Sequence, residues 1–245
     1  MITPRVLCFV CALLSVFVQA ENAAQPESPA AAENREEQGP RAWFVQTGIP
    51  RGMDNPVKVL IDGEIEMLTL SNRVASGPLK IPKDGIIRLV KEIPDPTGEK
   101  EFIYQTLAKA TVSGGMSKAL VIMVPRPKPA ADGSLFVTRV KSLGEFKAGE
   151  FMYMNLTKSK IGIEIADAKI PLESGKIRTH RVKGKGDLVS IPYRYSYFHK
   201  EKDRWMPLSA SMAILSSKRR EVFVFSHSGG GGAIRCRGIT IPGDL

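Results

Sequence analysis

The sequence predicts an all-β protein, with two tandem β-sandwich domains that follow a signal peptide and a disordered acidic linker. Apolar residues alternate with polar residues in short runs along most of the chain. Turns that contain proline or glycine separate these runs at intervals of about 8 to 12 residues. No long run shows the 3.6-residue period of an amphipathic helix, so a sandwich or barrel is favoured.

Residues 1–20 have the organisation of a signal peptide. The positive charge of Arg5 precedes an apolar run from Val6 to Val18. At about 13 residues, this run is shorter than the roughly 20 that a membrane-spanning helix needs. The pattern Val18-Gln19-Ala20 then predicts cleavage after Ala20 and export to the periplasm, the cell surface or the medium. An uncleaved N-terminal anchor is the alternative; otherwise we expect no transmembrane segment in the mature chain.

Cleavage would remove Cys8 and Cys11 and leave Cys236 as the only cysteine. The mature chain could then form no intramolecular disulfide, even in an oxidising compartment. Its stability would therefore come from a packed core alone, for which the chain is long enough.

Residues 21–40 form the predicted linker. This stretch carries five glutamates, one arginine and three prolines, with no large apolar residue. It has nothing to bury, so we expect it to be disordered.

The first sandwich is predicted for residues 41–144. Its clearest element is a hairpin, in which Val57–Ile61 and Ile65–Leu70 flank Asp62-Gly63. An Asp-Gly pair suits the positive φ angles of a type I′ turn. Pro82–Gly85 and Asp95–Gly98 predict two further turns.

The second sandwich is predicted for residues 145–245. Ile161, Ile163 and Ile165 repeat the alternation of the first half, with Asp167 in the following turn. The alternating tyrosines from Tyr193 to Tyr197 predict a strand that returns, after a charged turn, through Trp205 to Ala213.

The two halves match in order, which predicts an internal duplication. The offset drifts between about 98 and 108 residues, as loop insertions would cause. The matches are Trp43–Thr47 with Phe151–Asn155, Val57–Asp62 with Ile161–Ala166, Gly85–Leu89 with Leu188–Ile191, Leu107 with Leu208, Lys118–Val124 with Arg220–Ser226, and Leu135–Val140 with Ala233–Gly238.

This layout resembles uncharacterised secreted proteins of Gram-negative bacteria that contain tandem immunoglobulin-like sandwiches. The resemblance rests on Asn155–Gly175 and on the stretch Arg204–Ser226. It implies an exported β protein, and it implies no catalytic activity because the family carries no established one.

Charge is the only bulk property that suggests a partner. The linker carries −4, residues 41–145 carry +4 (15 Lys/Arg against 11 Asp/Glu), and residues 146–245 carry +9 (18 against 9). Such a surface attracts anionic polymers or lipid head groups. The densest stretch predicts a speculative anion-binding ridge, with Lys176, Arg178 and His180 on one strand face and with cations on the following turn. Its cations are Lys176, Arg178, Arg181, Lys183 and Lys185. A solvated strand face with solubilising charges is the alternative interpretation.

No catalytic or metal-binding pattern stands out. His180, His199 and His227 are far apart in the sequence, so we predict neither a metal site nor a cofactor. Cys236 alternates with apolar neighbours and is expected to face the core. Trp205 and the tyrosines of 193–197 could form a platform for sugar rings, although we expect Trp205 in the core.

Three functions remain. The leading one is an exported, non-catalytic protein that binds or scaffolds a partner in the periplasm or at the cell surface. The second is a binder of anionic glycans or envelope surfaces through the basic domain. The third is a hydrolase with an unrecognised site between the domains. Partners would be an anionic envelope polymer or another exported protein, and nucleic acid is not expected.

Overall fold

The computed structural model describes residues 39–181, 188–227 and 232–242. The predicted signal peptide, its cleavage site at Ala20 and nearly all of the linker lie outside these residues. Residues from Gly39 onward form one compact unit. Among the described residues, no helix is long and apolar enough to cross a membrane.

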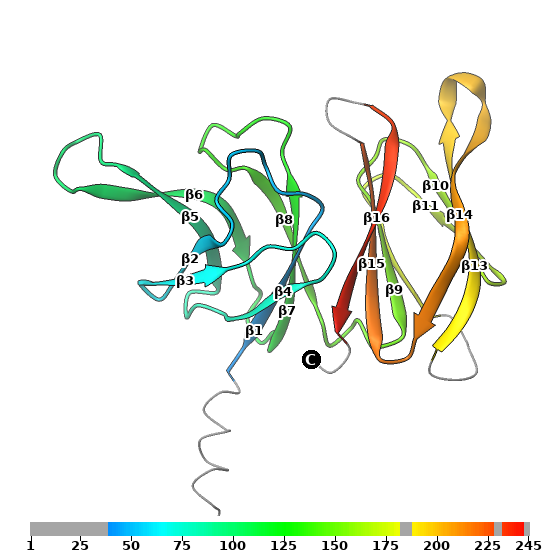
Figure 1. Ribbon diagram of the computed structural model, residues 1–245, viewed down its shortest axis with the longest axis horizontal. Helices are drawn as coiled ribbons and strands as arrows, with labels where there is room; N and C mark the ends of the chain where they lie inside the picture. Colours follow the sequence, from blue (N-terminus) through cyan, green and yellow to red (C-terminus); the bar gives the residue numbers. More distant parts are fainter. Residues whose placement is uncertain (1–38, 182–187, 228–231, 243–245) are drawn as a thin grey trace, which may run out of the picture. The chain divides into compact units, whose positions relative to one another are not determined.

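The described chain is all-β, as the sequence predicts, and its strands form two pairs of four-stranded sheets, consistent with two β-sandwich domains (Figure 1). The first half contains β1 (Arg41–Gln46), β2 (Val57–Ile61), β3 (Glu64–Leu68), β4 (Ser76–Lys80), β5 (Ile86–Pro94), β6 (Phe102–Thr111), β7 (Lys118–Pro125) and β8 (Phe136–Ser142). The second contains β9 (Glu150–Asn155), β10 (Ile161–Ile165), β11 (Ala168–Leu172), β12 (Ile177–Arg181), β13 (Leu188–His199), a 3₁₀ turn (Lys200–Lys202), β14 (Arg204–Ser216), β15 (Arg219–His227) and β16 (Ile234–Pro242).

Both halves have the same strand order. Sheets A (β4-β1-β7-β8) and B (β3-β2-β5-β6) form the first half, and sheets C (β12-β9-β15-β16) and D (β11-β10-β13-β14) form the second. Each strand of the first half therefore corresponds to the strand eight places later. The only parallel ladders between these strands, β1 with β7 and β9 with β15, also correspond. This agreement favours the predicted duplication.

A shared β-bulge strengthens the correspondence. Leu107 is the unpaired residue where the β5–β6 register shifts, and Leu208 is the unpaired residue at the same place between β13 and β14. Bulges are conserved features of related folds, and these two leucines were matched from the sequence.

Two of the predicted matches are displaced. Trp43 and Val45 face the same apolar cluster as Met152 and Met154, so Trp43 corresponds to Met152 and the first match is wrong by one residue. Leu89 pairs with Val59 as Tyr195 pairs with Ile163, which displaces the match between β5 and β13 as well.

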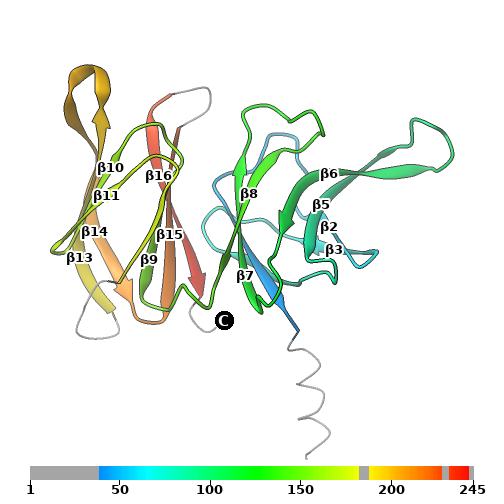
Figure 2. The same ribbon diagram turned by 180° about the vertical axis from the view of Figure 1, so that it is seen from behind.

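Local sequence explains the hairpins. In the β2–β3 turn, Asp62 and Gly63 have φ angles of 51° and 97°, as the type I′ prediction requires. In the β10–β11 turn, Ala166 takes a φ of 46° beside Asp167. The predicted return of the tyrosine strand through Trp205 is the long β13–β14 hairpin, whose strands lie side by side in Figures 1 and 2.

Each sandwich has its own core. Phe44, Val59 and Leu89 belong to the core between sheets A and B, and Tyr153, Ile163 and Tyr195 belong to the core between sheets C and D. Because side chains alternate along a strand, every second residue of β1 and β9 lies on the face of its sheet that is turned away from this core.

A third apolar cluster joins residues of sheets A and C. Its fully buried members include Leu120 and Ile122 from β7 together with Val222 and Val224 from β15. Leu143 and Phe146, from the segment that connects β8 to β9, complete it. Burial of these apolar side chains holds sheet A against sheet C.

Candidate functional site

The residues of the predicted anion-binding ridge lie along β12, the edge strand of sheet C. Arg178 is exposed on this strand, and Lys176 is exposed just before it. Arg181 ends the strand instead of lying on the turn. Its register partner is Glu150, whereas that of Arg178 is Tyr153, so alternation places the two arginines on opposite faces.

Arg181 is also engaged with its own sheet. One guanidinium nitrogen donates to the Ala148 carbonyl at 2.8 Å, and Nε lies 3.9 Å from a Glu150 carboxylate oxygen. Lys183 and Lys185 lie outside the described residues. The described structure therefore leaves Lys176 and Arg178 as neighbouring exposed cations of the ridge.

The structure brings together two histidines that are distant in the sequence. His199, at the end of β13, and His227, at the end of β15, line one hollow with Lys158 and Lys200. The His227 Nδ1 atom lies 3.0 Å from the Gly232 carbonyl oxygen. Within the described residues, no group of three His, Cys, Asp or Glu side chains could hold a metal ion.

Trp205 is not a core residue, which corrects the expectation from the sequence. It is 47% exposed, while Tyr195 is only 2% exposed in the core between sheets C and D. Trp205 packs edge-on against Phe198, with 5.6 Å between ring centroids. Because the bulge at Leu208 inserts one residue, the alternation of β14 changes phase, and this change places Trp205 on the outer face.

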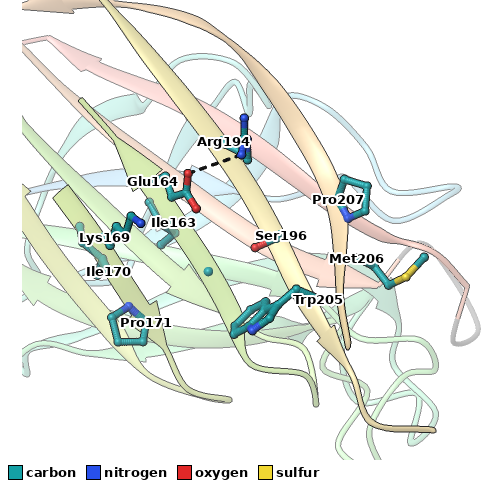
Figure 3. Close-up of a pocket in the computed structure, with 11 residues that line it drawn as sticks. Ile163, Glu164, Lys169, Ile170, Pro171, Arg194, Ser196, Trp205, Met206 and Pro207 are labelled. Carbon is teal, nitrogen blue, oxygen red and sulfur yellow. Dashed lines mark ion pairs between the residues drawn. The ribbon is translucent and has the colours of Figure 1, made fainter. Parts of the chain in front are cut away.

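Beside Trp205, the outer face of sheet D contains a groove of about 490 Å³, which we call the Trp205 groove (Figure 3). Gly162 forms its floor, because a Cβ atom at residue 162 would lie only 2.7 Å from the Ser196 hydroxyl oxygen and 3.1 Å from an indole carbon of Trp205. An isolated glycine within a strand is the sequence signal of such a close approach. The groove is lined by Gly162, Ile163, Glu164, Lys169, Ile170, Pro171, Arg194, Ser196, Trp205, Met206 and Pro207.

Polar groups are placed along one side of this groove. A guanidinium nitrogen of Arg194 lies 3.9 Å from a Glu164 carboxylate oxygen, with both side chains largely exposed (Figure 3). Lys169 pairs with Glu164 across β10 and β11, and Ser196 adds a hydroxyl. The groove thus combines an apolar platform with two cations, one carboxylate and one hydroxyl.

The first half shows what this part of the sheet face holds when a lysine replaces Gly162. By the strand correspondence, Lys58 stands in the place of Gly162, Glu92 in that of Phe198 and Tyr104 in that of Trp205. Lys58 forms an ion pair with Glu92, and the hollow beside it measures about 230 Å³. The Trp205 groove is therefore a departure from the repeat.

No protein-family model matches this chain, and no curated protein matches its sequence.

Proposed function

We propose that this chain is an exported, non-catalytic binding module that holds a saccharide in the Trp205 groove. One observation carries the proposal: a half-exposed indole stands over a glycine on an open sheet face, flanked by charged and hydroxyl groups. Export rests on the leader of residues 1–20, and we include the immunoglobulin-like type of sandwich in the proposal.

Sugar rings fit this arrangement chemically. A pyranose presents C–H groups on one face and hydroxyls around its rim. Trp205 offers a flat apolar surface to the ring face, and Glu164, Arg194 and Ser196 offer acceptors and donors to the rim. The size also suits, because small-molecule sites have volumes of about 300–1,000 Å³.

The charge of the groove favours neutral or acidic saccharides. Lys169 and Arg194 place two cations against the single carboxylate of Glu164. A uronic acid or a sulfated sugar would gain from this balance, whereas an amino sugar would not.

Tryptophan fluorescence tests the proposal directly, because the chain has two tryptophans and Trp43 is only 6% exposed. The mature chain is titrated with neutral, uronic-acid and sulfated oligosaccharides while emission and iodide quenching are recorded. We expect one class to shield Trp205 from iodide. Trp205→Ala should weaken binding of that class at least about tenfold, measured by calorimetry.

Gly162→Lys, which imports the residue of the first half, should have the same effect by filling the groove. Tyr104→Ala removes the aromatic residue at the corresponding place of the first half, and this control should bind as the wild type does. Equal affinity of all variants, or no shielding by any saccharide, contradicts the proposal.

A second candidate function is binding of an anionic envelope polymer through β12. Lys176 and Arg178 are exposed, and no ion pair with another described residue is found for either. Contacts of this kind weaken steeply with salt, because screening increases and counterions are no longer released as favourably.

Retention of the whole mature chain on heparin measures this candidate. A variant with Ser at 176, 178, 181, 183 and 185 should elute at lower salt. A control of equal charge, with Ser at Arg51, Lys83, Lys91, Lys100 and Lys128 of the first half, should elute later than this variant. Equal elution of the two variants would remove β12 from consideration.

A further inference from the structure

Every open sheet ends in strands whose outer backbone groups can pair with another chain, and proteins block such edges with charges, prolines or bulges. Each of the eight edge strands here carries a charged residue or a proline within the strand. The residues concerned are Glu64 and Glu66 in β3, Pro78 and Lys80 in β4, Lys109 in β6, Arg139 and Lys141 in β8, Lys169 and Pro171 in β11, Arg178 and Arg181 in β12, and Arg235 and Arg237 in β16.

In β14, the edge of sheet D, these residues are Arg204 and Pro207, and both lie in the first part of the strand. Its segment Ser209–Ser216 has neither a charged residue nor a proline over eight positions. Among the described residues, none outside the β13 ladder makes a backbone hydrogen bond to Ser209–Leu215. This edge is long enough to pair with a further strand.

The first half covers the corresponding edge with its own chain. The Leu135 N–H donates to the Leu107 carbonyl at 2.7 Å, and the Thr138 hydroxyl donates to the Lys109 carbonyl. These bonds satisfy the outer side of β6 beside β8. In the first half, the edge that corresponds to β14 is thus covered by β8 and the residue before it.

Apolar side chains surround the uncovered segment. Met212 and Ile214 are 56% and 70% exposed on β14, and Leu188 is 69% exposed on the neighbouring β13. Ile214 is the register partner of Ser190, and Leu188 that of Ser216, so the three side chains lie on the same outer face. Contiguous exposed apolar residues of this kind indicate an interaction surface.

We propose that Ser209–Ser216 pairs antiparallel with the same segment of a second copy of this chain, across a two-fold axis. Antiparallel pairing of a strand with itself is self-complementary, as an isologous interface requires. With the axis at Met212, it places Met212 opposite Met212 of the other copy and Ala210 opposite Ile214. An uncharged strand faces its own copy without like charges in contact, although each chain carries a formal charge of +10.

The absence of charge on Ser209–Ser216 also favours a second copy of the chain over an acidic partner at this edge. An acidic segment would gain little at an uncharged edge and much more at the basic strands β12 and β16. The dimer has the opposite salt dependence from anion binding, because salt screens the repulsion between two cationic chains.

Sedimentation velocity of the mature chain over a dilution series tests the dimer. We expect a species of twice the monomer mass, with a dissociation constant that falls as sodium chloride rises. Ile214→Lys should raise that constant by about a hundredfold or more, because each copy then places an ammonium group against the apolar Ala210 and Met212 of the other. The 70% exposure of residue 214 makes the substitution tolerable for the fold, and thermal melting checks it.

Met67→Lys is the matched control, since Met67 is 54% exposed on an edge strand of the first half. This variant should dimerise like the wild type. A wild-type chain that stays monomeric at every concentration and salt overturns the proposal, as does an Ile214→Lys dimer of unchanged affinity. A dimer that weakens as salt rises overturns it as well, because charged groups would then hold the copies together.

Discussion

Gly162 is the residue at which the two halves of the repeat differ with the greatest consequence for the surface. A Cβ atom there would lie 2.7 Å from the Ser196 hydroxyl oxygen and 3.1 Å from an indole carbon of Trp205. Lys58, which holds the corresponding place, instead extends to Glu92. A single position thus decides between an ion-paired surface and an open groove.

Gly162→Ala should therefore move the Trp205 ring away from the sheet with little effect on the strand. We expect iodide to quench Trp205 fluorescence more strongly and saccharide affinity to fall. Gly114→Ala is the matched control, because a Cβ atom at Gly114 meets nothing within 4 Å. Unchanged quenching in Gly162→Ala would show that the indole does not rest on residue 162.

Asn155 is a buried amide whose hydrogen-bonding capacity is used on both sides. Its Nδ2 donates to the Ser159 and Leu172 carbonyls at 2.8 and 3.0 Å, and its Oδ1 accepts from the Thr157 amide and hydroxyl at 2.9 and 2.7 Å. Asn155-Leu156-Thr157 has the pattern of a glycosylation sequon, but Asn155 is 0% exposed, so the role of its amide is structural.

Asn155→Ala should lower the free energy of unfolding by about 2 kcal/mol or more, because buried backbone groups lose their partners. Chemical denaturation measures the change. Asn72→Ala, at an exposed position, should stay within about 0.5 kcal/mol of the wild type. Equal effects of the two substitutions would contradict the role given to Asn155.

Glu221 gives a stability effect that depends on pH. Burial raises the pKa of its carboxyl above the ordinary 4.5, although the Thr240 hydroxyl, 3.1 Å from both oxygens, opposes the rise. A raised folded-state pKa favours the protonated form, so this residue supports the fold below the unfolded-state pKa. That support is lost as pH rises through the folded-state pKa.

Glu221→Gln removes the charge and keeps an acceptor for Thr240. The gain in melting temperature over the wild type should be larger at pH 7 than near pH 4, where the wild-type carboxyl is itself protonated. Calorimetric melting of both proteins at the two pH values measures this difference. A gain that is larger at acid pH would reverse the sign argued here.

At the scale of elements, local chemistry predicts the hairpins and alternation predicts most strands. Asp62-Gly63 and the isoleucines of 161–165 specify their turns and faces within a few neighbouring residues, so sequence alone suffices for them. The order of matched segments also predicts the repeated strand order seen in both halves.

Features that depend on cross-strand register could not be predicted in this way. The bulge at Leu208 changes the phase of β14 and moves Trp205 to the outer face, and an alternating pattern does not show where a phase change occurs. β12 also continues to Arg181 instead of ending before it, and alternation then places this residue on the face opposite Arg178. The groove itself joins β10, β11, β13 and β14, and only Gly162 gave a local signal for it.

At the scale of the whole chain, the cluster between sheets A and C is built from corresponding residues. Trp43 corresponds to Met152, Leu120 to Val222 and Ile122 to Val224, and all six belong to this cluster. When the same face of two equivalent sheets packs against itself, the two halves are related by an approximate two-fold rotation. The interface therefore has the form of a homodimer contact within one chain.

Pairing through β14 would also affect saccharide binding. Strands that pair antiparallel about a two-fold axis keep the same face of the joined sheet outward. The two Trp205 grooves would then open on one side, and a saccharide polymer that spans both would gain affinity through effective concentration.

The apolar cluster between sheets A and C also predicts that the two sandwiches unfold together. An isolated second half would expose the face of Met154, Val222, Val224 and Ile241, which the intact chain buries. Separating the halves would bring this surface into water, at a cost of about 25 cal/mol for each Å². Opening one sandwich therefore destabilises the other.

Two probes can follow the halves separately in a Trp205→Phe background. Trp43 fluorescence then reports on sheet A of the first half at its contact with sheet C. Near-ultraviolet dichroism of tyrosine reports mainly on the second half, which holds four of the five tyrosines. Leu89 lies only in the core between sheets A and B, and Leu89→Ala should cost about 3 kcal/mol. If the halves unfold together, both probes shift to one lower midpoint in Leu89→Ala. Leu120→Ala, at the interface, should have the same effect. A Leu89→Ala chain whose tyrosine transition stays at the wild-type midpoint would show two independent domains, joined only by a segment of chain.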